Sequence, residues 1–195
     1  LNLPEEKIKV RKEEHKNIIT EVCEIVREED IDIVLIPGDL LDYEACTPET
    51  TNFLIDKFSG ISPTPVIITP GNHDFYSPSS MYNSNLLLER RQGVWSDNVI
   101  IFKHHTFESI SLSPNLDISV TGISHSSNRP FNERLLKGDV PRSKSGVNIL
   151  VFHGSRDGFC PSDKDITLPF SDEELMKLGF DYSAIGHYHS YSEIV

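Results

Sequence analysis

The strongest constraint on the fold is a regular alternation of helical segments with short apolar runs. Residues 13–29 place their apolar side chains at helical spacing, with Glu, Lys and Arg on the other face. The β-branched run at residues 31–36 then ends at a Pro-Gly pair, as expected for a buried strand. A helix over residues 48–60, capped by Thr47, and a strand over residues 65–69 repeat this order. Such alternation predicts an α/β fold with a mostly parallel or mixed sheet covered by helices.

The second half of the chain adds more strands. A helix is predicted over residues 80–92, and after it come three apolar or alternating runs, close enough together for a β-meander: 98–102, 107–112 and 116–122. Residues 147–152 form the next predicted strand. Ser171 and Glu174 have the spacing of a capping box, which predicts a helix as far as residue 178. A last strand is predicted over residues 182–185.

The composition fits one domain over residues 1–195. A chain of 195 residues with 37% hydrophobic and 25% charged residues can bury a core and has the size of one α/β domain. The 12 prolines and 11 glycines are spread along the chain, so no linker or low-complexity segment divides it. Its 3 cysteines lack close spacing, which argues against a disulfide framework or a zinc knuckle and fits a reducing cytoplasm.

Charge and hydropathy restrict the partners. The net charge of −12 repels nucleic acid at long range, so binding of DNA or RNA needs a local basic patch or bound cations. Residues 129–144 carry more basic than acidic side chains, and an ordinary solvated loop is the preferred interpretation. The longest apolar stretches are far shorter than the roughly 20 residues of a membrane span, and the first residues lack a secretory signal. We therefore expect a soluble cytoplasmic protein.

Side chains with metal-binding chemistry come directly after four of the predicted strands. They are Asp39, Asn72, His73, Asp74, His153, His187 and His189. Glycine precedes several of them, which allows the backbone to turn sharply, and in open α/β sheets the ligand site lies beyond the carboxyl ends of the strands. A mixture of nitrogen and oxygen ligands favours Mn²⁺, Fe or Zn²⁺ over Mg²⁺ or Ca²⁺. The strand ends therefore predict a transition-metal site.

These residues form the series GD, GNHD, H and GHxH, which resembles the motif series of the calcineurin-like metallophosphoesterases. The resemblance covers residues 38–189. A lone GD carries no weight, but GNHD and GHYH, each directly after an apolar strand and in the right order, are specific. The resemblance implies a four-layer α-β-β-α sandwich of mixed sheets. It also implies two divalent transition-metal ions, with Mn²⁺ the first choice and Fe or Zn²⁺ as alternatives.

The resemblance further implies a role for each ligand. Asp39 would bridge the two metals, while Asn72, His153 and His187 would complete the shell of the second metal. His189 would bind the first metal. The family also opens with a D-x-H motif that binds the first metal, and no D-x-H occurs in this sequence. We therefore expect a catalytic domain truncated at both ends, with the missing motif upstream of residue 1.

The catalytic pair implied by the resemblance is His73 and Asp74. His73 would not bind metal; it would face the scissile phosphate as a general acid or a stabiliser of the transition state, with Asp74 fixing its orientation. Two other polar residues are set aside. His125 is interpreted as a surface hydrogen-bonder, and Asp42 as a turn residue.

The sequence from Asp39 to Asp42 and the early helix with Arg11 are most similar to the SbcD-type DNA repair exonuclease branch, whose members act with an SMC-like ATPase. This resemblance implies a nuclease that hydrolyses DNA phosphodiester bonds and has such an ATPase as partner, with a homodimer left open. Two alternatives stay open. One is a phosphomonoesterase or cyclic-nucleotide phosphodiesterase; the other is a non-catalytic scaffold on the same fold.

Overall fold

The computed structural model describes residues 4–42, 46–113, 116–161, 165–189 and 191–194. Its helices are α1 Glu5–Glu28, α2 Pro48–Ser59, α3 Ser84–Glu89 and α4 Asp172–Lys177, with a short 3-10 helix η2 Leu135–Lys137. Its strands are β1 Val34–Ile36, β2 Val66–Ile68, β3 Val99–Ile101, β4 Glu108–Ser113, β5 Leu116–Gly122, β6 Val147–His153 and β7 Tyr182–Gly186. None of the described helices is both long and apolar enough to cross a membrane.

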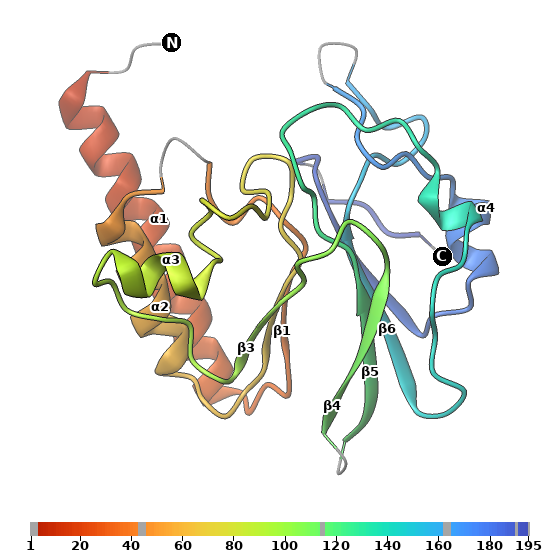
Figure 1. Ribbon diagram of the computed structural model, residues 1–195, viewed down its shortest axis with the longest axis horizontal. Helices are drawn as coiled ribbons and strands as arrows, with labels where there is room; N and C mark the ends of the chain where they lie inside the picture. Colours follow the sequence, from red (N-terminus) through yellow and green to blue (C-terminus); the bar gives the residue numbers. More distant parts are fainter. Residues whose placement is uncertain (1–3, 43–45, 114–115, 162–164, 190, 195) are drawn as a thin grey trace.

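The strands form two sheets. β1, β2 and β3 make a parallel sheet in that order, and β4, β5, β6 and β7 make a mixed sheet in which only the β4–β5 pair is antiparallel. In Figure 1, helices α1, α2 and α3 cover the outer face of the first sheet, and α4 covers the outer face of the second. The predicted four-layer α-β-β-α sandwich is therefore confirmed.

Alternating side chains on the inner strands explain the layers. On β2, Val66 and Ile68 pack in the cluster beneath the first helices, while Ile67 faces the second sheet. On β6, Ile149 and Val151 face the first sheet, whereas Leu150 and Phe152 pack in the cluster shared with α4. Because successive side chains of a strand point to opposite faces, a run of apolar residues can fill both layers. For this reason the sequences of the central strands are continuous runs of apolar residues.

The predicted β-meander is wrong. β3 pairs with β2, in the register Val66↔Val99, and belongs to the first sheet, while β4 and β5 pair only within the second. The link at residues 102–107 contains no Gly, Pro, Asn or Asp, so it lacks the residues that favour a tight hairpin turn. This link instead carries the chain from one sheet to the other (Figure 1).

Two helices differ from their predicted bounds. α1 begins at Glu5, eight residues before the predicted start, because the exposed segment before residue 13 is rich in good helix formers. α3 is shorter than predicted and covers only Ser84–Glu89. The predicted caps of the other helices are confirmed: Thr47 accepts from the Thr50 N–H, and Ser171 and Glu174 form a capping box.

Candidate metal centre

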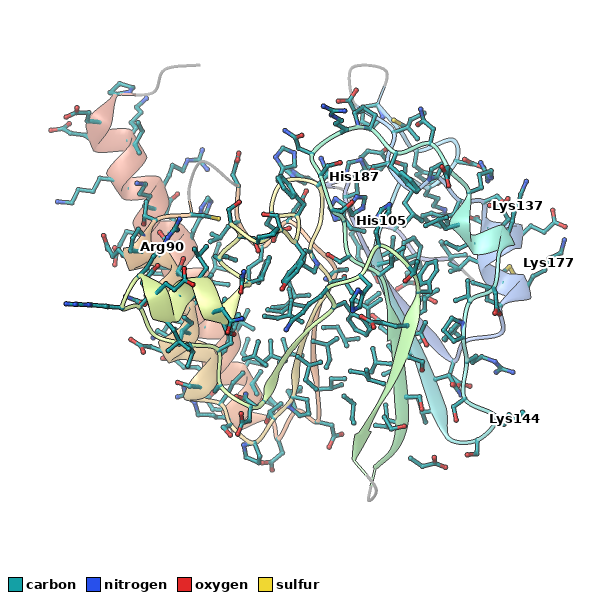
Figure 2. All side chains as sticks on the ribbon, viewed as in Figure 1. Arg90, His105, Lys137, Lys144, Lys177 and His187 are labelled. Atoms are coloured by element: carbon teal, nitrogen blue, oxygen red, sulfur yellow. The ribbon has the colours of Figure 1, made fainter. Side chains whose placement is uncertain are left out.

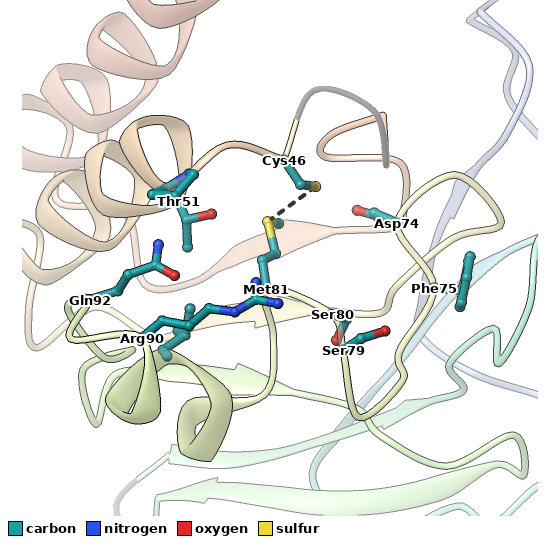
Figure 3. A pocket seen from close by; sticks show the side chains of 11 residues that line it. Cys46, Thr51, Asp74, Phe75, Ser79, Ser80, Met81, Arg90 and Gln92 are labelled. Atoms are coloured by element: carbon teal, nitrogen blue, oxygen red, sulfur yellow. Dashed lines mark hydrogen bonds between the residues drawn. The ribbon is translucent and has the colours of Figure 1, made fainter.

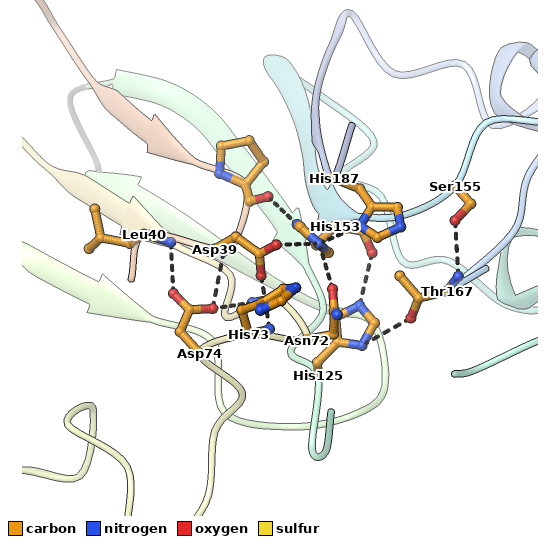
Figure 4. A network of polar contacts seen from close by, with 12 residues as sticks. Asp39, Leu40, Asn72, His73, Asp74, His125, His153, Ser155, Thr167 and His187 are labelled. Carbon is orange, nitrogen blue, oxygen red and sulfur yellow. Dashed lines mark hydrogen bonds and ion pairs between the residues drawn. The ribbon is translucent and has the colours of Figure 1, made fainter. Parts of the chain in front are cut away.

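Four side chains from four strand ends meet at one point (Figure 4). Nε2 of His153 lies 3.0 Å from Oδ1 of Asn72, 3.0 Å from Nδ1 of His187 and 3.2 Å from Oδ2 of Asp39. One ligand atom each from Asp39, His153 and His187 lie within 4.8 Å of one another. Asp39 and Asn72 follow β1 and β2 of the first sheet, whereas His153 and His187 lie at the ends of β6 and β7. The site is therefore built from both sheets.

Hydrogen bonds on the far side of each imidazole fix its orientation. Nδ1 of His153 lies 3.0 Å from the carbonyl oxygen of Pro37, and Nε2 of His187 lies 3.3 Å from that of Asp165. A carbonyl oxygen only accepts, so each of these ring nitrogens carries the hydrogen and donates it. The opposite nitrogens, Nε2 of His153 and Nδ1 of His187, are left to present a lone pair to the common point. Figure 2 shows His187 at the strand-end side of the molecule.

The donor set fits a divalent cation. Two imidazole nitrogens, an amide oxygen and a carboxylate oxygen face one another, and all four atoms are acceptors in this arrangement. A single proton on His153 could satisfy only one of its neighbours well, whereas a cation interacts with all of them at once. Mixed nitrogen and oxygen ligation is the chemistry of manganese, iron and zinc sites. The four residues can therefore hold a transition-metal ion.

The electrostatics of the site favour the forms that bind a cation. Burial raises the pKa of Asp39, but a proton on Nε2 of His153, through its hydrogen bond and charge, and the backbone N–H of His73 outweigh burial and lower that pKa below its usual value. A metal cation in place of the His153 proton would also lower the pKa of Asp39. Burial, with a contribution from His153, lowers the pKa of His187. At neutral pH the site therefore presents a carboxylate and a neutral imidazole at these two positions.

Two glycines permit the close approach of the loops. A Cβ on Gly71 would lie 2.3 Å from Oδ1 of Asp39, and a Cβ on Gly38 would lie 2.5 Å from Nδ1 of His153. Gly38 also has a φ of +84°, in the left-handed region that disfavours other residues. The glycines of the GD and GNHD motifs are thus explained by the packing of the ligands.

We expect Gly71→Ala to weaken Mn²⁺ binding and to destabilise the fold by about 1–3 kcal/mol, as overpacking does. The methyl group would collide with the Asp39 carboxylate, so that side chain must move away from the site. Calorimetric titration and thermal unfolding measure the two effects. Gly93→Ala is the matched control, since a Cβ there meets its nearest neighbour at an ordinary 3.4 Å. Unchanged Mn²⁺ affinity in Gly71→Ala would contradict the prediction.

The structure does not bring His189 into this group. His189 is exposed and lies outside the described residues whose ligand atoms cluster. Its expected co-ligands belong to the D-x-H motif, which this sequence lacks. Its assignment to the first metal stays a prediction.

His73 lies beside the ligands. Its backbone N–H donates to Oδ1 of Asp39 at 3.0 Å, while its side chain is 56% exposed. An exposed imidazole next to a metal site can reach a bound phosphate ester, as the predicted role as a proton donor requires.

The predicted role of Asp74 is corrected. Its carboxylate is 3% exposed and forms no described hydrogen bond with the His73 side chain. It accepts from four other groups, the backbone N–H groups of Gly71 (2.7 Å), Leu40 (2.8 Å) and Asp39 (3.1 Å) and the Tyr82 hydroxyl (2.6 Å). Burial raises the pKa of Asp74, and hydrogen bonds from Tyr82 and Gly71 act against this rise. Asp74 therefore holds the loops after β1 and β2 together instead of orienting His73.

Asp42 is the acidic residue that faces His73. Its Oδ2 lies 4.0 Å from Nδ1 of His73, and its side chain is 63% exposed. The interpretation of Asp42 as a mere turn residue missed this proximity. The only signal in the sequence was that Asp42 follows Asp39 by three residues, so that a second carboxylate lies near the same end of β1.

We expect Asp42→Asn to lower kcat by no more than about fivefold, because water screens a pair of exposed side chains. Mn²⁺ affinity should stay unchanged, since Asp42 is outside the described ligand group. Steady-state kinetics in Mn²⁺ check this prediction. A hundredfold loss of kcat would show that Asp42 has a larger part in the chemistry than its exposure suggests.

His125 is buried, and its interpretation as a surface hydrogen-bonder was wrong. The side chain is 2% exposed, and its Nε2–H donates to the backbone carbonyl of His153 at 2.9 Å (Figure 4). Burial lowers the pKa of His125 to about 4, so it stays neutral at physiological pH. His125 lies just after β5 and its hydrogen bond reaches the end of β6, so this histidine supports the strand end that carries a ligand. No local signal in the sequence indicates this burial, which depends on the packing of the two sheets.

A two-sheet α/β sandwich with a nitrogen and oxygen donor set at its strand ends defines a class of metal-dependent hydrolases. Comparison with family models agrees with this class. The model described as calcineurin-like phosphoesterase matches residues 12–191, so the chain belongs to the calcineurin-like phosphoesterase family. Members of this family are dinuclear metal-dependent hydrolases.

Three curated relatives are similar to this chain. The DNA double-strand break repair protein Mre11 of Methanopyrus kandleri is 24% identical over 190 residues, 93% of this chain and 41% of the relative. A subunit of the nuclease SbcCD from Staphylococcus epidermidis is 24% identical over 191 residues, 91% of this chain and 51% of the relative. The uncharacterized metallophosphoesterase YhaO of Bacillus subtilis is 29% identical over 168 residues, 83% of this chain and 37% of the relative. The chain thus spans about half, or less, of the length of these relatives, and two of them support the predicted SbcD-type branch.

Proposed function

We propose that this chain is the catalytic core of a Mn²⁺-dependent nuclease that hydrolyses phosphodiester bonds of DNA. The observation that carries the proposal is the convergence of three acceptor atoms at 3.0–3.2 Å from Nε2 of His153. The names of two relatives, a DNA double-strand break repair protein and a component of a nuclease, support DNA as the substrate. Mn²⁺ is the proposed metal because the donors combine imidazole nitrogens with carboxylate and amide oxygens.

The residues divide the chemistry between them. Asp39, Asn72, His153 and His187 would hold metal, and His189 is proposed for the other ion of the pair. Bound divalent ions supply positive charge to the phosphate oxygens and make a water molecule acidic enough to act as a nucleophile. Hydrolysis forms a bond from the water oxygen to phosphorus and breaks the bond to the leaving alkoxide. His73 would donate the proton that this alkoxide needs.

The charge of the chain also bears on substrate binding. With a net charge of −12, the protein repels DNA at long range, so local positive charges must attract the phosphate backbone of the DNA. The basic stretch at residues 129–144 is partly neutralised, because Arg134 pairs with Asp157 and Glu174 and Lys137 pairs with Glu174. These contacts support the interpretation of that stretch as an ordinary surface loop. Bound metal ions would add positive charge where a phosphodiester binds.

We further propose that the protein works with an SMC-like ATPase. The name of the staphylococcal relative describes one component of a larger nuclease. Co-purification of the full-length protein with its ATPase partner from the native host tests this proposal.

A substrate panel tests the nuclease assignment. The full-length protein with Mn²⁺ is offered single-stranded DNA, p-nitrophenyl phosphate and cyclic nucleotides, and Asp39→Asn serves as the inactive control. Release of nucleotides from DNA is the expected result. Activity on the phosphomonoester or the cyclic nucleotides alone would establish the alternative substrate class. Failure to bind Mn²⁺ would favour the non-catalytic scaffold.

A further inference from the structure

We propose that Tyr82 is a positioning residue for the metal centre, and that it acts through Asp74 on the backbone that carries Asp39. The inference rests on the metal centre of the proposed function. Tyr82 lies outside the GD, GNHD and GHYH motifs and touches none of the four ligand side chains in the described hydrogen bonds.

The contact between Tyr82 and Asp74 is short and shielded from water. The Tyr82 hydroxyl donates to Oδ2 of Asp74 at 2.6 Å, and both side chains are buried. Burial raises the pKa of Tyr82 well above its usual value, so the hydroxyl keeps its proton and remains a donor. A hydrogen bond to a buried carboxylate is stronger than one between neutral groups in water. The position of the Asp74 carboxylate therefore depends on this hydroxyl.

Asp74 transmits that position to the ligand loop. Its Oδ1 accepts from the N–H groups of Gly71 and Asp39, and its Oδ2 accepts from Leu40 as well as from Tyr82. Asp39 has a φ of +53°, in the left-handed region, which aspartate enters more readily than most residues other than glycine but which still benefits from supporting contacts. The hydrogen bonds from Asp39 and Leu40 to Asp74 are such contacts. Any shift of Asp74 would release the backbone that directs the Asp39 carboxylate.

The tyrosine ring is held from the other side by the core. It stacks on Trp95 with ring centroids 6.1 Å apart, and Nε1 of Trp95 donates to the carbonyl of Met81 at 2.9 Å. The stacking packs one face of the ring without using its hydroxyl. Tyr82 thus connects a rigid part of the first layer to the metal loops.

The segment between Asp74 and Tyr82 packs less tightly on one side. It borders a cavity of about 200 Å³, which Ser80 and Met81 line together with Asp74 (Figure 3). The buried hydroxyl of Ser80 has no hydrogen-bond partner among the described residues. Of the four described hydrogen bonds to the Asp74 carboxylate, three come from backbone N–H groups and the one from the Tyr82 hydroxyl comes from a side chain.

Tyr82→Phe tests the inference because it removes only the hydroxyl and keeps the ring. We expect Mn²⁺ affinity, measured by calorimetric titration of the full chain, to fall about 10–100-fold, the usual effect of removing a partner that orients a metal ligand. The rise in melting temperature on adding Mn²⁺ should shrink accordingly. Circular dichroism at the titration temperature confirms that the variant is folded.

Trp95→Phe is the matched control for stability. It removes the hydrogen bond to Met81 and alters the ring stacking but leaves the Tyr82 hydroxyl in place. We expect it to lower the melting temperature while Mn²⁺ affinity stays within about twofold of the unmodified chain. Unchanged affinity in Tyr82→Phe, or an equal loss of affinity in Trp95→Phe, would overturn the inference. If the unmodified chain itself failed to bind Mn²⁺, the metal centre and the inference would fall together.

Discussion

Replacing Asp39 with asparagine is expected to abolish Mn²⁺-dependent phosphodiester hydrolysis, with a loss of about 10³-fold or more. Asparagine keeps the size of the side chain but removes the only negative charge in the described ligand group. The carboxylate lies 3.2 Å from Nε2 of His153, so its charge acts where the cation would bind. A neutral amide is a much weaker ligand for a divalent ion than a carboxylate. Steady-state kinetics on bis-p-nitrophenyl phosphate and calorimetric titration with Mn²⁺ measure the two losses.

Asp32→Asn is the control for the change of charge. Asp32 is exposed and precedes β1, so this substitution alters the net charge by the same amount at the other end of the strand. Its activity and Mn²⁺ affinity should match those of the unmodified chain. Normal hydrolysis by Asp39→Asn would show that the Asp39 carboxylate is not a metal ligand. The proposed mechanism would then lose its basis.

The second large effect is expected from His73→Ala, which should lower kcat by about 10²–10⁴-fold, the usual contribution of a positioned proton donor. Mn²⁺ affinity should be retained, because the His73 side chain is outside the described ligand group and more than half exposed. A loss of kcat with unchanged Mn²⁺ affinity identifies a proton donor, whereas a loss of both identifies a metal ligand.

His104→Ala serves as the control for His73→Ala. His104 is also exposed, and its side chain has no described contact with the site, so its loss should leave both kcat and Mn²⁺ affinity unchanged. Were His73→Ala to lose Mn²⁺ binding in proportion to its activity, His73 would have to be reassigned as a ligand.

The elements that the sequence predicted well are those whose signals are local. Thr47 and Ser171 cap their helices because a short side chain at that position meets an unsatisfied N–H within the same turn. The donors of the site were found for a similar reason. Asp39, Asn72 and His187 each follow a short apolar run, and the ends of neighbouring strands meet at one edge.

What the sequence could not predict depends on contacts between distant residues. β3 has the pattern of any short strand, and nothing within residues 98–102 indicates that its partner is β2 rather than β4. Asp74 was assigned to its neighbour His73, but its described partners are Gly71 of its own loop, the loop after β1 and Tyr82. His125 carries no local sign of its place beneath His153. In each case the deciding factor is the packing of the two sheets, which periodicity along the chain does not record.

The division of the donors between the two sheets has a mechanical consequence. Asp39 and Asn72 come from one half of the molecule, and His153 and His187 come from the other half. An ion held by all four would cross-link the halves at the rim of their shared interface, in addition to the apolar contacts between the sheets. Removal of the ion by a chelator should therefore weaken the interface between the two halves before either sheet loses its own strand pairing. Binding of the ion and packing of the two halves are thus coupled.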